Sequence, residues 1–221
     1  MKKFIFSLVM ALMTVISVNA QSIEFHQSYG STSDLAPYAA TRVIGSYFWV
    51  SKNEKMNLFT WNAFDRNAVN TLLYTEHQIG KSNFYVHPEV RFDYWYGSEN
   101  SNAYDFKPML GISYLIPWNN GPAIYLTPKV MTTYNYADGC SGWTDADLQF
   151  SINSSYENDN VYYEGYIDTN WFNHGCHPSL FTEQKAYYKM TDKFNIGAAV
   201  VFTADENNAF AQPYFSVKVN L

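Results

Sequence analysis

The sequence predicts an all-β fold: an up-and-down antiparallel transmembrane β-barrel of about 12 strands, with 10 as the fallback. Three observations favour it. Segments in which apolar and polar residues alternate with a period of two recur along the chain, the connections between them alternate in length, and aromatic residues gather near strand ends. Aromatic residues make up 19% of the 221 residues, more than the core of a soluble domain of this size needs.

The first part of the chain, 1–20, is expected to be a signal peptide rather than part of the barrel. Lys2 and Lys3 precede an apolar run from Phe4 to Ile16, and small residues lead to a cleavage site after Ala20. This order is typical of a secretory signal. A membrane-anchoring helix is the alternative, but the run is short for a span of about 20 residues. The expected barrel domain is 21–221.

Twelve strand-like segments follow, separated by turn residues. They are 22–29, 41–50, 56–64, 71–79, 83–96, 105–116, 123–136, 145–156, 161–171, 180–190, 194–203 and 209–220. Beyond the signal there is no apolar run of about 18 residues, which excludes a spanning helix but not membrane strands of about 9–11 residues.

The connections alternate between two lengths. The short ones are Ser51–Lys55, Gly80–Ser82, Pro117–Pro122, Glu157–Asn160 and Thr191–Lys193. The interleaved ones are mostly longer: Gly30–Ala40, Asp65–Asn70, Gly97–Tyr104, Ala137–Thr144 and Phe172–Ser179, with only Ala204–Asn208 short. Short turns at one end and longer loops at the other are typical of outer-membrane barrels.

The segment NVYYEGYIDTNWF, 160–172, raises the question of which strand face is wet. Odd positions include Val161 and Ile167, whereas even positions include Glu164 and Asp168. A soluble β-sandwich would bury the apolar face, and this alternative stays open. Aromatic residues near strand ends and the unequal connections favour the reverse, with the apolar face toward lipid and the polar face toward a lumen.

This phase puts many charged and aromatic side chains in the lumen. The acidic ones are Glu24, Glu76, Glu89, Asp93, Asp145, Asp147, Glu164, Asp168 and Glu183, and the basic ones are Arg91, Lys107, Lys129, Lys185, Lys189 and Lys218. The candidates for solute contact are Tyr85, Glu89, Arg91, Trp95, Tyr125, Lys129, Tyr162, Glu164, Tyr166, Asp168, Tyr214 and Lys218, with Tyr187 also pointing inward. Aromatic rings in a narrow pore could stack on a flat or cyclic solute. Alternatively, the charges pair with one another and plug the barrel.

Cysteine, histidine and charge patterns bound the remaining functions. Cys140 and Cys176 fall in loops at the same end, and an exported protein reaches an oxidising compartment, so a disulfide is expected, with two free cysteines as the alternative. His174 and His177 flank Cys176, but this is a weak metal signal, and no metal or cofactor is expected. The sequence contains no recognisable catalytic set, so an enzyme is not expected. A net charge of −6 without a basic patch excludes nucleic acid as a partner.

Four prolines fall inside predicted strands. They are Pro88, Pro108, Pro128 and Pro213, all on the lipid-facing phase. Proline cannot donate to a β-ladder, and a closed barrel has no free edge, so we expect β-bulges at these positions.

The runs DLQFSINSSYENDNVYYEGYIDTNWF, LFTEQKAYYKMTDKFNIGAAVVFTADENNAF and PYFSVKVNL resemble a Bacteroidetes family of outer-membrane β-barrels of uncharacterised function. That family resembles the nucleoside-specific channel-forming protein Tsx, a 12-stranded barrel. SIEFHQSYG and YTEHQIGKSNFYVHPEVRF are similar in layout, whereas Leu221 stands where many outer-membrane barrels end in Phe. No residue for nucleoside contact can be carried over.

The resemblance implies a channel in the bacterial outer membrane for passive, selective passage of small solutes, nucleosides being favoured. Its expected partners are outer-membrane lipid and a nucleoside-like small molecule, and other envelope proteins stay open. The alternatives are a plugged structural or accessory barrel and a secreted soluble β-sandwich that binds a ligand.

Overall fold

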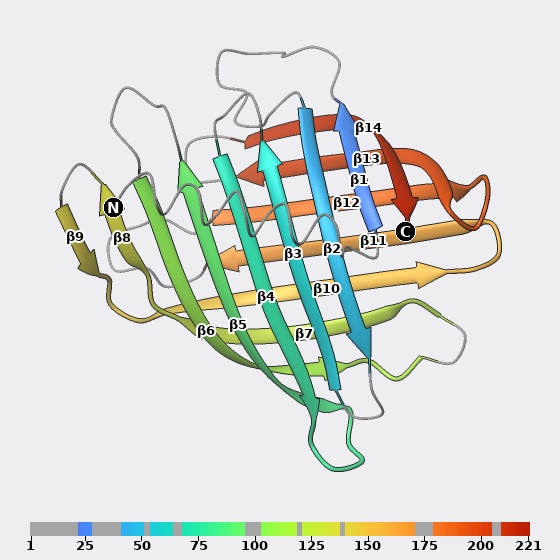
Figure 1. The fold of residues 1–221 in the computed structure, drawn as a ribbon. Helices are drawn as coiled ribbons and strands as arrows, with labels where there is room; N and C mark the ends of the chain where they lie inside the picture. Colours follow the sequence, from blue (N-terminus) through green and yellow to red (C-terminus); the bar gives the residue numbers. More distant parts are fainter. Residues whose placement is uncertain are drawn as a thin grey trace.

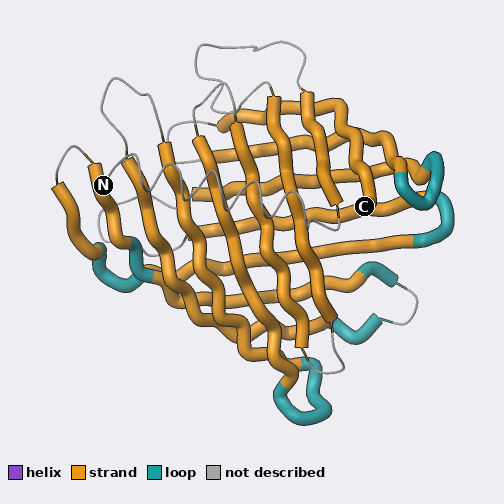
Figure 2. Tube along the Cα trace, in the orientation of Figure 1, coloured by secondary structure: helices purple, strands orange, loops and turns teal. Residues whose placement is uncertain are grey.

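The computed structural model describes residues 22–27, 41–50, 54–63, 68–95, 103–118, 121–137, 140–170, 179–204 and 209–221. Their regular structure consists of β1 Ser22–Gln27, β2 Thr41–Val50, β3 Glu54–Ala63, β4 Ala68–Gln78, β5 Phe84–Trp95, β6 Ala103–Leu115, β7 Ala123–Met131, β8 Tyr134–Ala137, β9 Cys140–Trp143, β10 Asp147–Glu157, β11 Val161–Asn170, β12 Ser179–Lys189, β13 Phe194–Ala204 and β14 Ala209–Asn220. Figure 2 shows these strands in orange and the described turns between them in teal. Within the described ranges, no helix is long and apolar enough to cross a membrane.

Twelve of these strands close into a ring of antiparallel pairs. Strands that follow one another in the ring are hydrogen-bonded neighbours: β1 to β7 in chain order, then β7 to β10, and β10 to β14. Pairing of β1 with β14, from Ser22↔Asn220 to Gln27↔Phe215, joins the first and the last of the described strands. In Figure 1, β2–β6 cross β10–β14 at a steep angle, as tilted strands on opposite walls of a barrel do. The predicted 12-stranded up-and-down fold is confirmed, and the two-sheet sandwich is not observed in the described residues.

The remaining two strands, β8 and β9, continue β7 and β10. Both β7 and β8 pair with β6 in one register, because Met109↔Met131 and Phe106↔Tyr134 fit the same alignment. Between them, Thr132 N donates to Pro108 O at 3.4 Å. Pro108 has no N–H to donate in return, which explains why the ladder breaks there. The predicted strand 123–136 therefore consists of two strands, β7 and β8, that follow one another along β6 in the same register.

The prediction of a longer loop at Ala137–Thr144 is wrong. Strand β9 lies inside that range and pairs with β8 from Tyr134↔Trp143 to Ala137↔Cys140. Only Asp138 and Gly139 separate the two strands in the sequence, and Asp-Gly is a favoured dipeptide for a two-residue hairpin connection. The prediction assigned the whole range to a loop and missed the strand that it contains.

Pro88, Pro108 and Pro128 each keep the ladder on one side of the strand and interrupt it on the other. Pro88 pairs with Leu110 of β6, but the β4–β5 ladder skips from Tyr74↔Glu89 to His77↔Val86. The skip covers the same number of residues on both strands, so the expected bulge is absent from this pair of described strands.

Pro128 also interrupts the ladder on one side of its strand only. Pro128 pairs with Phe150 of β10, whereas the β6–β7 ladder skips from Gly111↔Lys129 to Tyr114↔Leu126, again without a change of register. Pro213 pairs with Val200 of β13, and the position that would face it on the β1 side lies outside the described residues. In the described ladders beside Pro88 and Pro128, a missing donor is thus confined to one side of the strand.

Polar side chains contact one another at the two skipped positions. Ser113 Oγ and Thr127 Oγ1 lie 2.8 Å apart where the β6–β7 ladder is interrupted. Glu76 Oε1 and His87 Nδ1 lie 3.5 Å apart where the β4–β5 ladder is interrupted. These contacts hold the strands together on the interior face, where the backbone pairs are missing.

Burial is inverted relative to a soluble protein. The side chains of Glu24, Lys185 and Ser216 are almost wholly buried, whereas Leu110 and Phe215 are 60% and 51% exposed. Along β14, exposed and buried residues alternate from Ala211 to Ser216. The polar face of the strands points into the ring and the apolar face points outward, as the alternation predicted.

Candidate functional site: the charged barrel interior

Two groups of polar side chains lie inside the ring. The Arg91 network consists of His87, Glu89, Arg91, Asp93, Lys107, Lys129, Ser151 and Asp168. The Glu24 network consists of Glu24, His26, Tyr162, Glu164, Glu183, Lys185, Tyr187 and Lys218. Strand β11 contributes to both, because Glu164 and Asp168 occupy the same face of that strand.

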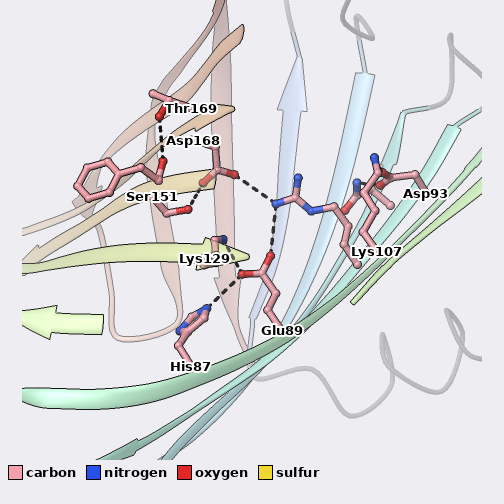
Figure 3. A network of polar contacts seen from close by, with 11 residues as sticks. His87, Glu89, Asp93, Lys107, Lys129, Ser151, Asp168 and Thr169 are labelled. Carbon is pink, nitrogen blue, oxygen red and sulfur yellow. Dashed lines mark hydrogen bonds and ion pairs between the residues drawn. The ribbon is translucent and has the colours of Figure 1, made fainter. Parts of the chain in front are cut away.

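The best-buried part of the Arg91 network centres on Glu89. Its Oε2 accepts a hydrogen bond from Lys129 Nζ at 2.7 Å and lies 3.1 Å from His87 Nε2. Glu89 and Lys129 are each only 3% exposed, and Figure 3 shows both side chains together with His87. The contact joins β5 to β7 across the intervening β6. Burying these charges is tolerable because each meets an opposite charge.

Arg91 extends this network to a more distant strand. One guanidinium nitrogen, Nη2, lies 3.2 Å from Asp168 Oδ2 and 3.5 Å from Glu89 Oε1. Ser151 Oγ donates a hydrogen bond to the other carboxylate oxygen of Asp168. By the shorter way round the ring, β6, β7 and β10 separate β5 from β11. The Arg91–Asp168 pair therefore reaches between non-adjacent parts of the wall.

Glu24 collects four contacts in the second network. Its Oε2 accepts hydrogen bonds from Lys185 Nζ and Tyr187 OH, both at 3.0 Å, and lies 3.1 Å from His26 Nε2. Its Oε1 lies 3.1 Å from Lys218 Nζ. These partners come from β1, β12 and β14. Four polar contacts around one carboxylate compensate for its loss of water.

Aromatic rings adjoin the Glu24 network. Lys218 Nζ lies 4.2 Å from the ring centroid of Tyr162, within cation–π range, and the Tyr162 and Tyr187 rings are 6.1 Å apart. Tyr162 also donates a hydrogen bond to Glu164. This brings together three of the predicted solute-contact residues: Tyr162, Glu164 and Lys218.

The remaining aromatic residues that were predicted to contact a solute do not form one cluster with Tyr162. Tyr85 and Tyr125 meet edge to face at 6.0 Å, and Tyr166 stacks on Phe181 at 5.4 Å. Tyr214 is 3% exposed and meets His26 edge to face, so little of its ring is left for a solute. The side chain of Trp95 lies outside what the structure describes.

Two expected lumen charges lie apart from both networks. Asp145 is exposed, and Lys189 pairs with the exposed Glu157 beside a turn. His26 and His87 were not among the predicted lumen residues, although the sequence contained a signal for both. Glu24 and His26, like His87 and Glu89, stand two residues apart on the polar face of a strand. Spacing alone indicates that each pair shares a face.

The predicted signal peptide and disulfide fall outside the described residues. Residues 1–21 and Cys176 are not described, nor is the side chain of Cys140, so both expectations stay predictions. Among the described side chains, no three His, Cys, Asp or Glu residues form a group that could hold a metal ion.

Comparison with known proteins identifies structural likeness only. No family model and no curated protein matches the chain. The NanC porin is 12% identical with a TM-score of 0.53, covering 90% of this chain and 98% of that one. The translocator domain of the autotransporter NalP from Neisseria meningitidis is 9% identical with a TM-score of 0.43, covering 97% and 95%. The first likeness shows that this chain shares the β-barrel fold of that porin.

Proposed function

We propose that this protein is an outer-membrane channel for passive passage of small solutes, with nucleosides as the favoured class. The observation that carries the proposal is the inverted burial: charged side chains line the interior of a closed ring, and apolar side chains such as Leu110 and Phe215 face outward. A barrel in lipid needs an apolar exterior, and a polar interior suits a water-filled path. The likeness to the NanC porin fold supports the same class.

The balance of interior charge supports a preference for cations. The acidic side chains of the two networks and their neighbours are Glu24, Glu76, Glu89, Asp93, Asp105, Asp147, Glu164, Asp168 and Glu183. The basic ones are Arg91, Lys107, Lys129, Lys185 and Lys218. Carboxylates outnumber permanent cations, and rings of acidic side chains favour cations in pores.

A plugged structural or accessory barrel is the second candidate. The ion pairs between non-adjacent strands, Arg91–Asp168 and Lys185–Glu24, favour it because they place side chains across the interior. In a plugged barrel, the interior charges pair with one another and no solute passes through the lumen.

Conductance in a planar lipid bilayer distinguishes the two candidates. The full-length protein is expressed, extracted from outer membranes with detergent and added to the bilayer. We expect stepwise ionic currents that favour cations over anions. A purified barrel that shifts its gel migration on heating, as closed barrels do, yet carries no current contradicts the channel. Recovery of the protein without detergent contradicts the membrane location.

The nucleoside preference predicts a role for Tyr166. Tyr166 is an interior residue of β11 and stacks on Phe181, so its ring is held in a fixed orientation. We expect nucleosides to block the current transiently and Tyr166→Ala to weaken that block about tenfold, since one base–aromatic stack contributes roughly 1–3 kcal/mol. The measurement is the nucleoside concentration that halves the current.

A matched control keeps this prediction specific. Tyr188 lies on the outer face of β12 and is 55% exposed, so Tyr188→Ala removes an equal ring away from the interior. We expect it to leave the block unchanged. Equal effects of the two substitutions, or a block unaffected by Tyr166→Ala, would rule out stacking on Tyr166.

A further inference from the structure

We propose that the Arg91–Asp168 pair is a strut across the lumen that limits the size of solute the channel admits; this rests on the proposed channel function. The strut consists of a long side chain from β5 and a carboxylate from β11, joined at 3.2 Å. Three strands separate their attachment points along the shorter side of the ring. A contact between such strands occupies space that a passing solute would need.

Both ends of the strut are fixed by further contacts. Ser151 donates a hydrogen bond to Asp168, and Arg91 also lies 3.5 Å from Glu89. Glu89 in turn is held by Lys129 at 2.7 Å. The strut is thus continuous from β7 through β5 to β10 and β11, and charge-assisted contacts of this kind hold long side chains in one geometry.

Arg91 retains some exposure inside the ring, unlike the lysine beside it in the network. Its side chain is 22% exposed, whereas Lys129 is 3% exposed. Its Nε is buried and makes no hydrogen bond within the described residues, so the exposed part of the side chain lies elsewhere on the group. The partial exposure places the guanidinium to meet a solute in the lumen rather than only to fill a core.

Lys107 provides a matched comparison at the same level of the barrel. It stands directly opposite Arg91 in the β5–β6 register and has nearly the same exposure, 21%. Its partners are Asp93 on the adjacent strand, at 2.8 Å, and Asp105 on its own strand, at 3.3 Å. Lys107 therefore carries the same charge as Arg91 but stays along the wall.

The test measures how fast neutral sugars of increasing size enter liposomes that contain the full-length protein. Neutral probes report width without the influence of charge. We expect Arg91→Gln and Asp168→Asn both to speed entry of the largest admitted sugar about twofold or more, because wider pores pass solutes faster. Lys107→Gln should speed entry less than either, because Lys107 contacts only its own strand and the adjacent one.

The variants separate width from electrostatics. Arg91→Gln removes a positive charge and Asp168→Asn removes a negative one, so a charge effect would act in opposite directions and a strut effect in the same direction. Asp168→Asn is nearly isosteric and carries the test if Arg91→Gln does not fold. Heat-dependent gel migration confirms that each variant forms a closed barrel.

The outcomes distinguish the strut from the channel function. Sugar entry that is equal in the wild type and all three variants overturns the strut and leaves the channel standing. Entry only after Arg91→Gln or Asp168→Asn supports the strut and overturns passive passage by the wild type. A barrel that admits nothing in any form overturns both. Equally fast entry after Lys107→Gln would assign the effect to loosening of interior side chains in general and overturn the strut.

Discussion

Lys185→Ala is expected to lower the free energy of unfolding by about 3–5 kcal/mol, the usual cost of breaking a buried ion pair from one side. Lys185 Nζ lies 3.0 Å from Glu24 and 3.2 Å from Glu164, and the lysine side chain is 2% exposed. Its removal leaves two carboxylates inside the ring with fewer compensating charges. Urea unfolding of the barrel in lipid vesicles, followed by tryptophan fluorescence, measures the change.

Lys189→Ala is the matched control on the same strand. Lys189 pairs with Glu157, whose side chain is 62% exposed beside the β10–β11 turn. Exposed pairs contribute about 0–1 kcal/mol, so this substitution should leave the unfolding midpoint almost unchanged. Equal losses for Lys185→Ala and Lys189→Ala would mean that water screens the barrel interior as effectively as the surface.

The strands and their phase were predictable because both follow from local alternation. Glu164 and Asp168 alternate with Val161 and Ile167, and a period of two fixes which side chains share a face. The same rule applied to β5 places Glu89 and Arg91 together. Once one strand is assigned to the lumen, antiparallel pairing carries that assignment around the ring, because directly paired residues share a face.

The contacts within the lumen were not predictable from the same pattern. Arg91 and Asp168 are 77 residues apart in the sequence, and their meeting depends on the curvature and tilt of the closed ring. Alternation shows that both point inward but not which partner each one reaches. The prediction of β-bulges at the prolines was wrong for Pro88 and Pro128, because alternation does not show how a ladder accommodates a missing donor. The structure places each of Pro88 and Pro128 beside one interrupted ladder, with the register intact on both sides.

Ile167→Arg is expected to lower barrel stability by roughly 2–4 kcal/mol, as a cation does on the lipid face near the middle of a bilayer. Ile167 pairs directly with Ile152 of β10 on the outer face of the sheet. A charged side chain there must be inserted into hydrocarbon or reach to the interface, and both cost free energy. The measurement is again urea unfolding in lipid vesicles, together with the yield of folded barrel on a heat-modifiability gel.

Asp168→Asn tests the same assignment from the other face. Asp168 is the next residue in β11 and points inward, where Ser151 donates a hydrogen bond to it. An asparagine oxygen can still accept that bond, and Arg91 keeps its contact with Glu89, so we expect a smaller loss of stability than for Ile167→Arg. If Ile167→Arg folds normally while Asp168→Asn prevents assembly, the apolar face does not meet lipid and the membrane-barrel proposal fails.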